Sequence, residues 1–66
     1  MTVTEIVEMT RVQSDATAAW AALKKLAARA EGDEYAQVIA AANLCAGMSD
    51  RAGEALAATT EETEAA

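Results

Sequence analysis

The sequence has no proline, no histidine and no phenylalanine, and its 66 residues include one cysteine, one tryptophan and one tyrosine. A single cysteine excludes an internal disulfide, and the lack of histidine removes the usual ligand sets of zinc sites and of di-metal helical bundles. The scarcity of aromatic residues and the absence of proline, together with abundant alanine and glutamate, favour helices over sheets. We therefore predict an all-α chain that holds no metal and no cofactor.

A chain of this size and composition gains little stability from apolar burial. A chain of this size buries only about 60% of the surface that its unfolded form exposes. Much of the apolar content is alanine, and burying one methyl group yields roughly 0.8 kcal/mol, against about 1.5 to 3 kcal/mol for a Leu or Val side chain. Without a disulfide or a metal, association with another chain is the remaining source of stability.

The N-terminal residues and the longest apolar run bear on location. Glu5 and Glu8 stand where a secretory signal would have a basic region and an apolar core, so no signal is expected. The longest apolar run, 35–48, contains Gln37 and Asn43 and is shorter than the ~20 residues that span a bilayer. We predict a cytoplasmic protein without a membrane segment, and the bias toward Ala, Glu and Thr suggests a bacterial or phage source.

Start and stop signals divide the chain into two helices. Thr2 followed by Glu5 fits a capping box, so the first helix is expected to begin there. Gly32 can adopt the left-handed conformation that closes a helix, and Asp33 can cap the next one. The predicted hairpin spans 1–58, with helices at about 3–30 and 34–58, a turn at 31–33 and a disordered acidic tail at 59–66. Gly47 leaves a kink in the second helix open, although the apolar pattern keeps its phase there and favours one continuous helix.

Each predicted helix carries a stripe of residues spaced alternately three and four apart, as one face of a helix requires. The first stripe is Met9, Val12, Ala16, Ala19, Leu23, Leu26 and Ala30, with Trp20 and Ala27 on its flank. The second stripe is Tyr35, Val38, Ala42, Cys45, Ser49, Ala52 and Leu56. Folding the chain back about Gly32 pairs Leu26 with Val38, Leu23 with Ala42, Ala19 with Cys45, Ala16 with Ser49, Val12 with Ala52 and Met9 with Leu56. The pattern predicts an antiparallel, coiled-coil-like hairpin with an alanine-rich seam.

Few residues are suited to chemistry. Cys45 has no histidine that would hold it as a thiolate, and it lies in the second stripe, so we interpret it as a small core residue. The tail acids Glu61, Glu62 and Glu64 lack the alternating ligands and the glycine of a calcium loop. We predict no catalytic, cofactor-binding or metal-binding residue, and no enzyme activity.

Apolar residues outside the two stripes, and Trp20 beside them, indicate association. The candidate interface consists of Ile6, Trp20, Ile39, Leu44 and Met48. We predict a homodimer in which two hairpins form a four-helix bundle, with Trp20 and Ile39 as the anchors. A hetero-complex, in which a larger protein partner covers this surface, is the alternative arrangement.

Two classes of function fit this sequence. The first is a small, non-enzymatic interaction or adaptor protein that acts through helical-bundle assembly and docks to a larger partner. The alternative is a nucleic-acid-related regulator, because Lys24, Lys25 and Arg29 form the only basic cluster, and the residues after Gly32 hold the entire net charge of -6. Such a regulator would touch nucleic acid through the basic cluster or block a DNA-binding protein by acidity. Three cations can neutralise only a few phosphates, so we rank the nucleic-acid function below the protein-interaction function.

Overall fold

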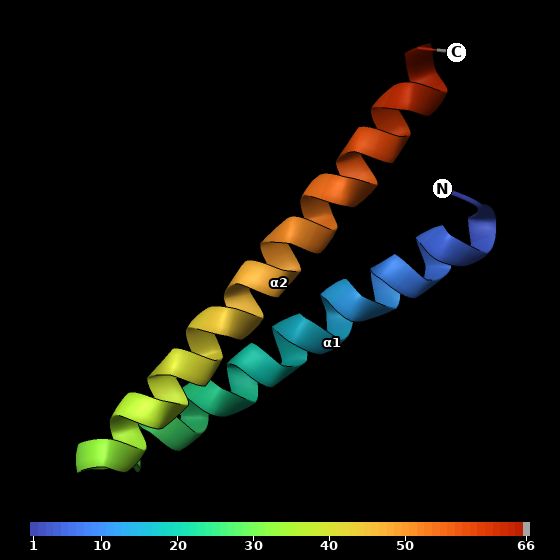
Figure 1. The fold of residues 1–66 in the computed structure, drawn as a ribbon. Helices are drawn as coiled ribbons and strands as arrows, with labels where there is room; N and C mark the ends of the chain where they lie inside the picture. The colour runs from blue at the N-terminus through green and yellow to red at the C-terminus, as the bar shows by residue number, and fades with distance from the viewer. Residues whose placement is uncertain (66) are drawn as a thin grey trace.

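The computed structural model describes the backbone of residues 1–65 and the side chains of residues 1–59. Two helices, α1 (Val3–Ala27) and α2 (Gly32–Ala65), pack against each other as a hairpin, and the described residues form no strand. The body is long and narrow, with extents of 52 × 16 × 12 Å. Figure 1 shows that the helices cross and separate toward the two chain ends. The all-helical prediction is confirmed, and neither helix, within the described residues, is long and apolar enough to cross a membrane.

The capping box at the start of α1 forms as predicted. The Glu5 N–H donates to Thr2 Oγ1 at 3.1 Å, and the Thr2 N–H donates to Glu5 Oε1 at 2.9 Å. The backbone N–H of Thr2, followed by its hydroxyl, lowers the pKa of the Glu5 carboxyl, because both hydrogen bonds favour the charged form. At the other end, Lys24 and Lys25 lie in the last turn of α1, where the helix dipole favours positive charge.

α1 ends at Ala27, earlier than the predicted residue 30. The N–H of Ala28 bonds to the carbonyl of Lys24 at 3.3 Å, and the N–H groups of the next two residues bond to the carbonyl of Leu26, each at 3.0 Å. The bonds from Ala28 and Ala30 have the helical spacing of four residues, whereas the bond from Arg29 spans three, and together they satisfy the last carbonyls of the helix. The predicted last turn of the helix is therefore part of the connection.

Gly32 has φ of +58° and, among the described residues, is the only one with a positive φ. It stands at the first position of α2, so it reverses the chain into the second helix rather than closing the first. Asp33 consequently lies inside the first turn of α2 and not at the cap before it, which corrects the predicted capping role. With Glu34 it places negative charge at the positive end of the helix dipole.

α2 continues unbroken through Gly47 and Gly53 to Ala65, beyond the predicted end at residue 58. The sequence after Leu56 contains neither glycine nor proline, so nothing in it stops a helix. The predicted disordered tail, 59–66, thus has a helical backbone to Ala65. The side chains from residue 60 onward, and all of Ala66, lie outside the described residues.

Alanine forms the contact between the helices, which we call the seam. Among residues 1–59, four are buried: Ala16, Ala27, Ala42 and Ala52. On α1 the seam also includes the half-buried Ile6, Met9, Gln13 and Leu23, with Trp20 at its edge, and on α2 it includes Val38, Cys45, Ser49 and Leu56; Ala30, in the connection, is half-buried as well. No larger side chain among residues 1–59 is buried to the same degree. The seam therefore gains little apolar burial per residue, as the composition predicted.

Two contacts fix the register of the hairpin. Thr17 Oγ1 lies 2.9 Å from Ser49 Oγ, and because the Thr17 hydroxyl already donates to the carbonyl of Gln13, the Ser49 hydroxyl is the donor. Farther along, Gln13 packs over Gly53, where an added Cβ would lie 2.9 Å from Gln13 Nε2. Ser49 thus faces Thr17 and not the predicted Ala16.

α1 is rotated about its axis relative to the predicted stripe. Met9, Ala16, Leu23 and Ala30 face α2 as predicted, but Val12, Ala19 and Leu26 are exposed, and their places in the seam are taken by Gln13, Trp20 and Ala27. On α2 the predicted stripe holds from Val38 to Leu56, whereas Tyr35 is about half exposed. The rotation partly covers Trp20, the largest side chain, which gains more from burial than Ala19 does.

Candidate functional site

The rotation of α1 gives the hairpin two unlike sides flanking the seam. One side, which we call the apolar side, carries Val12, Ala19, Ala22 and Leu26 of α1 and Ala41, Leu44, Met48 and Ala55 of α2. The other, the polar side, carries Thr10, Ser14, Thr17 and Lys24 of α1 and Asp50 of α2. Residues seven apart point in nearly the same direction from a helix, so each set forms lines that run along the hairpin.

Surface hollows show which lines of the two helices share a side. Leu26 of α1 lines one hollow together with Glu34, Gln37 and Val38 of α2. Ala41, Met48 and Ala55 continue the line of Glu34, and Leu44 continues the line of Gln37, each at intervals of seven residues. The exposed residues of α1 and α2 on the apolar side therefore form one continuous surface.

The apolar side contains much of the exposed apolar bulk of the hairpin. The exposed fraction is 41% for Val12, 49% for Leu26, 71% for Leu44 and 52% for Met48. Single exposed apolar residues are ordinary on soluble proteins, but a contiguous group on one side marks a site of association. Val3 and Val7 are also exposed, but they lie near the N-terminus and on other faces of α1.

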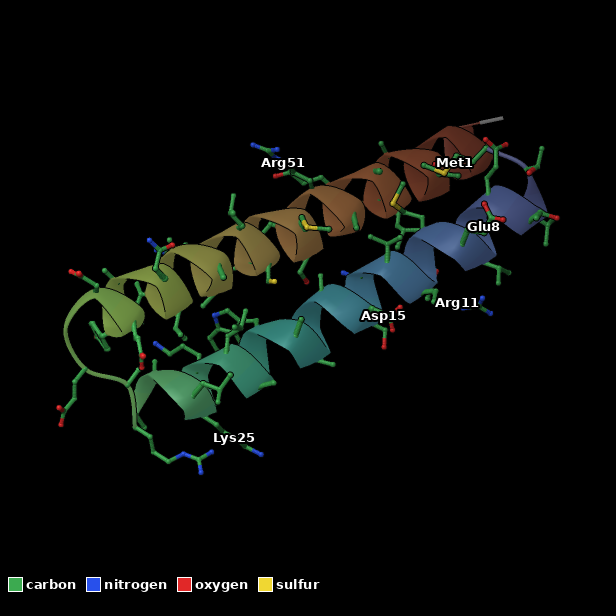
Figure 2. The ribbon with its side chains drawn as sticks, turned by 60° about the horizontal axis from the view of Figure 1, so that its bottom comes forward. Met1, Glu8, Arg11, Asp15, Lys25 and Arg51 are labelled. Carbon is green, nitrogen blue, oxygen red and sulfur yellow. The ribbon has the colours of Figure 1, made fainter. Side chains whose placement is uncertain are left out.

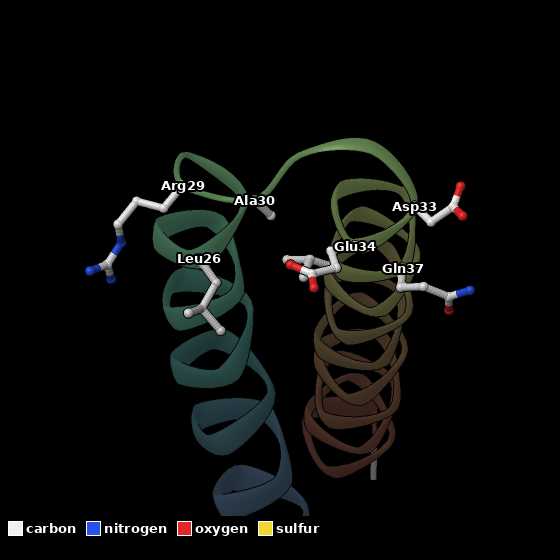
Figure 3. Close-up of a pocket in the computed structure, with 7 residues that line it drawn as sticks. Leu26, Arg29, Ala30, Asp33, Glu34 and Gln37 are labelled. Carbon is white, nitrogen blue, oxygen red and sulfur yellow. The ribbon is translucent and has the colours of Figure 1, made fainter.

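The hollow near the turn has a volume of about 480 Å³ and lies between Leu26 of α1, Ala30 of the connection and Val38 of α2. Figure 3 shows that Glu34 extends toward α1, while Arg29 points away from α2 and Asp33 points away from α1. Charged groups thus rim the hollow and its floor is apolar. A second hollow of about 300 Å³ lies on α2 beside Leu44 and Met48, with Arg51 at its edge.

The exposed part of the Trp20 side chain lies toward the polar side. It lines a smaller hollow of about 170 Å³ with Thr17, Ser49 and Asp50, and 40% of its surface is exposed. Ala46, a small residue of α2, also lines this hollow and leaves room for the indole ring. Trp20 is therefore partly covered within the hairpin and does not join the apolar side.

The structure divides the predicted interface between different surfaces. Leu44 and Met48 lie on the apolar side, Ile6 and Ile39 are half-buried, and Trp20 lines a hollow on the polar side. Sequence reasoning missed Val12 and Leu26 as surface residues because it assigned them to the seam. The position of Trp20 beside the first stripe was the signal that could have found them, since rotating α1 to bring Trp20 nearer to α2 turns Val12 and Leu26 outward.

The residues of the predicted basic cluster, Lys24, Lys25 and Arg29, lie in the last turn of α1 and just beyond it. Lys24 and Lys25 are consecutive in a helix, so their side chains diverge by about 100°. Lys24 belongs to the polar side, seven residues after Thr17, and Figure 2 shows Lys25 pointing outward. Arg29 lies beyond the end of α1, at the rim of the apolar hollow.

Cys45, the one thiol, is half-buried in the seam, as the stripe predicted. Among the residues whose side chains are described, no group of three or more Cys or acidic side chains is placed to hold a metal ion. The acids Glu61, Glu62 and Glu64 lie outside that part of the chain. The apolar side is consequently the surface on which a functional proposal can be built.

Comparison with known proteins finds no similarity: the chain matches no protein-family model, no curated protein and no solved structure.

Proposed function

We propose that this chain is a small, non-enzymatic protein-association module, and that its apolar side is the surface with which it binds other helices. The observation that carries the proposal is the gathering of Val12, Leu26, Leu44 and Met48 on one side, each at least two-fifths exposed. The seam beneath them buries only alanine fully, so covering this side adds apolar burial that the hairpin alone lacks. Homodimerisation into a four-helix bundle and docking to a larger protein both use such a surface.

The arrangement of charge favours this function over direct nucleic-acid binding. Lys24 and Lys25 point to different faces of α1, and the chain as a whole carries a net charge of -6. Affinity for nucleic acid grows with the number of phosphates that a protein neutralises together, and the candidate cluster has only three cations. A gel-shift assay at low salt tests this point, and we expect no shift.

Two neighbouring alanines provide a matched test of the association surface. Ala19 and Ala21 are both exposed in the middle of α1, but Ala19 lies on the apolar side and Ala21 lines a hollow with Thr17 of the polar side. Tagged wild-type protein, Ala19→Glu and Ala21→Glu are each tested for association by solution mass and by capture from an extract of the native host. We expect Ala19→Glu to abolish the association that wild-type protein and Ala21→Glu retain. Equal association by both variants would refute the assignment of the surface.

A further inference from the structure

The most apolar line of residues on α1 is split between two surfaces. Its members, in order, are Met9, Val12, Ala16, Ala19, Leu23, Leu26 and Ala30, with no polar entry. Alternate members face the seam, and the members between them, Val12, Ala19 and Leu26, face the apolar side. The average direction of these seven side chains therefore lies between the direction of the seam and the direction of the apolar side. A helix with such a line is suited to contact two neighbours at roughly a right angle, as each helix in a four-helix bundle does.

α2 carries an equivalent line on the same side of the hairpin. It consists of Val38, Ala41, Cys45, Met48, Ala52 and Ala55, which are all apolar, and Glu34 precedes them on the same line. The line of α1 that is centred on the seam includes Gln13, and that of α2 includes Ser49. Along the middle of the hairpin, both helices are therefore patterned for a second layer over the apolar side as well as for the seam.

We infer that this second layer is another copy of the same chain, related by a two-fold axis parallel to the long axis of the hairpin, so that both turns lie at the same end. The inference rests on the proposed function and specifies its partner. In this arrangement α1 of one copy lies against α2 of the other, and the two helices run antiparallel. Closed two-fold symmetry uses the same surface on both copies.

The register of this dimer follows from that of the hairpin. A rotation about the long axis leaves the height of every residue unchanged, so α1 meets the partner's α2 at the heights where it meets its own. The contact between Thr17 and Ser49 fixes those heights within the chain. Counting along both helices from this pair places Ala19 level with Met48, and Leu26 level with Ala41, to within one residue.

At each of these heights a large side chain meets an alanine. Met48 faces Ala19 of the partner subunit, and Leu44 faces Ala22 of the partner subunit. Leu26 and Val12 face Ala41 and Ala55 of the partner subunit, respectively. Alternation of large and small residues across facing positions is what close packing between helix layers requires. Leu44, at 71% exposure the most exposed of the large apolar residues on this side, is covered.

Charge is complementary in the same register. Asp15 and Arg51 lie at the same height but on opposite edges of the hairpin, and Figure 2 shows both pointing away from the seam. Within one chain they do not approach each other. The two-fold rotation brings the α1 edge of one copy over the α2 edge of the other, so each Asp15 lies near Arg51 of the partner subunit. Two such pairs form at the rim of the interface.

Covering the whole broad side of the hairpin would bury an area of the size that specific dimers use. The broad side of the hairpin measures 52 × 16 Å, a footprint of about 800 Å² at most. Specific protein interfaces bury about 800 Å² on each partner. Rotation about an axis that is perpendicular to the helices and passes at the height of Met48 would instead place Met48 against Met48 of the partner subunit and Ala19 against Ala19 of the partner subunit. Large would then meet large and small would meet small, which packs less well.

Sedimentation equilibrium of the full chain is the first test. At on the order of 100 µM, we expect twice the monomer mass for wild-type protein and for Ala21→Glu. Ala19→Glu places a carboxylate against Met48 of the partner subunit, and its dissociation constant should rise on the order of 100-fold. Circular dichroism checks that both variants remain helical. A wild-type monomer at this concentration, or a dimer unaffected by Ala19→Glu, would overturn the inference.

Disulfide trapping distinguishes the two symmetry axes. Ala19→Cys and Met48→Cys are each made in a Cys45→Ala background. Each variant is oxidised alone, and an equimolar mixture of the two reduced variants is oxidised in parallel. The parallel axis predicts a covalent dimer in the mixture and none in either separate sample, because the two cysteines face each other across the interface. Self-cross-linking of each variant alone would indicate the perpendicular axis and refute the arrangement.

Failure of this inference and failure of the proposed function give different results. If the wild-type chain is monomeric but captures another protein in a manner that Ala19→Glu abolishes and Ala21→Glu does not, the surface is correct and the second copy is wrong. If no association depends on Ala19, the proposed function itself fails.

Discussion

Two glycine-to-alanine substitutions should change the stability of the hairpin in opposite directions. At Gly32, φ is +58°, and an L-residue in the left-handed region costs roughly 1–2 kcal/mol. Alanine also restricts the unfolded chain, which returns about 0.4–1 kcal/mol. We therefore expect Gly32→Ala to lower the free energy of unfolding by about 1 kcal/mol. At Gly47, in the interior of α2, an added Cβ meets nothing within 4 Å, and alanine should raise the stability by about 0.8–1 kcal/mol.

Thermal unfolding followed by circular dichroism measures both effects. A difference of about 2 kcal/mol between the variants corresponds to a separation in Tm on the order of 10 °C for a chain of this size. The protein concentration must be the same in all samples and low, because association would itself raise Tm. Stabilisation by Gly32→Ala would show that the turn tolerates another conformation, and destabilisation by Gly47→Ala would show that α2 bends or is contacted there.

Three further predictions concern the cap, a hydroxyl contact and the seam. Thr2→Ala should destabilise the protein by about 1 kcal/mol. The folded state lowers the pKa of Glu5, so the stabilisation by the cap is fully present above the ordinary pKa of Glu5. It is lost as the pH falls through the lower pKa of the folded state. NMR titration of Glu5 and unfolding at several pH values check this, and a cap effect that grew in acid would contradict it. Thr17→Val, which keeps the shape but loses both hydroxyl hydrogen bonds, should cost about 0.5–1 kcal/mol in urea unfolding; no change would mean that water replaces them. In dilute, monomeric protein, Leu23→Ala should cost about 2 kcal/mol and Leu26→Ala less than about 1 kcal/mol; equal losses would mean that α1 is not rotated as described.

Local signals in the sequence predicted the helical hairpin. The Thr2 and Glu5 pair predicted the capping box, because the relevant contacts lie within one turn of helix. Gly32 predicted the reversal of the chain, since few other residues adopt its backbone conformation. These features depend on neighbours in the chain and need no knowledge of the tertiary contact.

The rotation of α1 could not be predicted from periodicity. Lines centred on Val12 and on Gln13 both have the helical period, and the line through Val12 is the more apolar. The choice between them depends on what α2 presents: Gly53 leaves space for Gln13, and Ala46 leaves space for Trp20. That information is tertiary. The exposed apolar side was missed for the same reason, because its residues had been assigned to the seam.

The alanine seam also determines how the hairpin should respond to heat. The heat-capacity change on unfolding grows with the apolar area that unfolding exposes, and the four buried residues here are all alanines. An isolated hairpin should therefore have a small heat-capacity change and a flat stability curve that varies little with temperature. Its calorimetric transition should be broad, because a short chain also has a small unfolding enthalpy. Any partner that covers Leu26 and Leu44 would add apolar area to the transition, so a sharper calorimetric peak and a larger heat-capacity step would accompany binding.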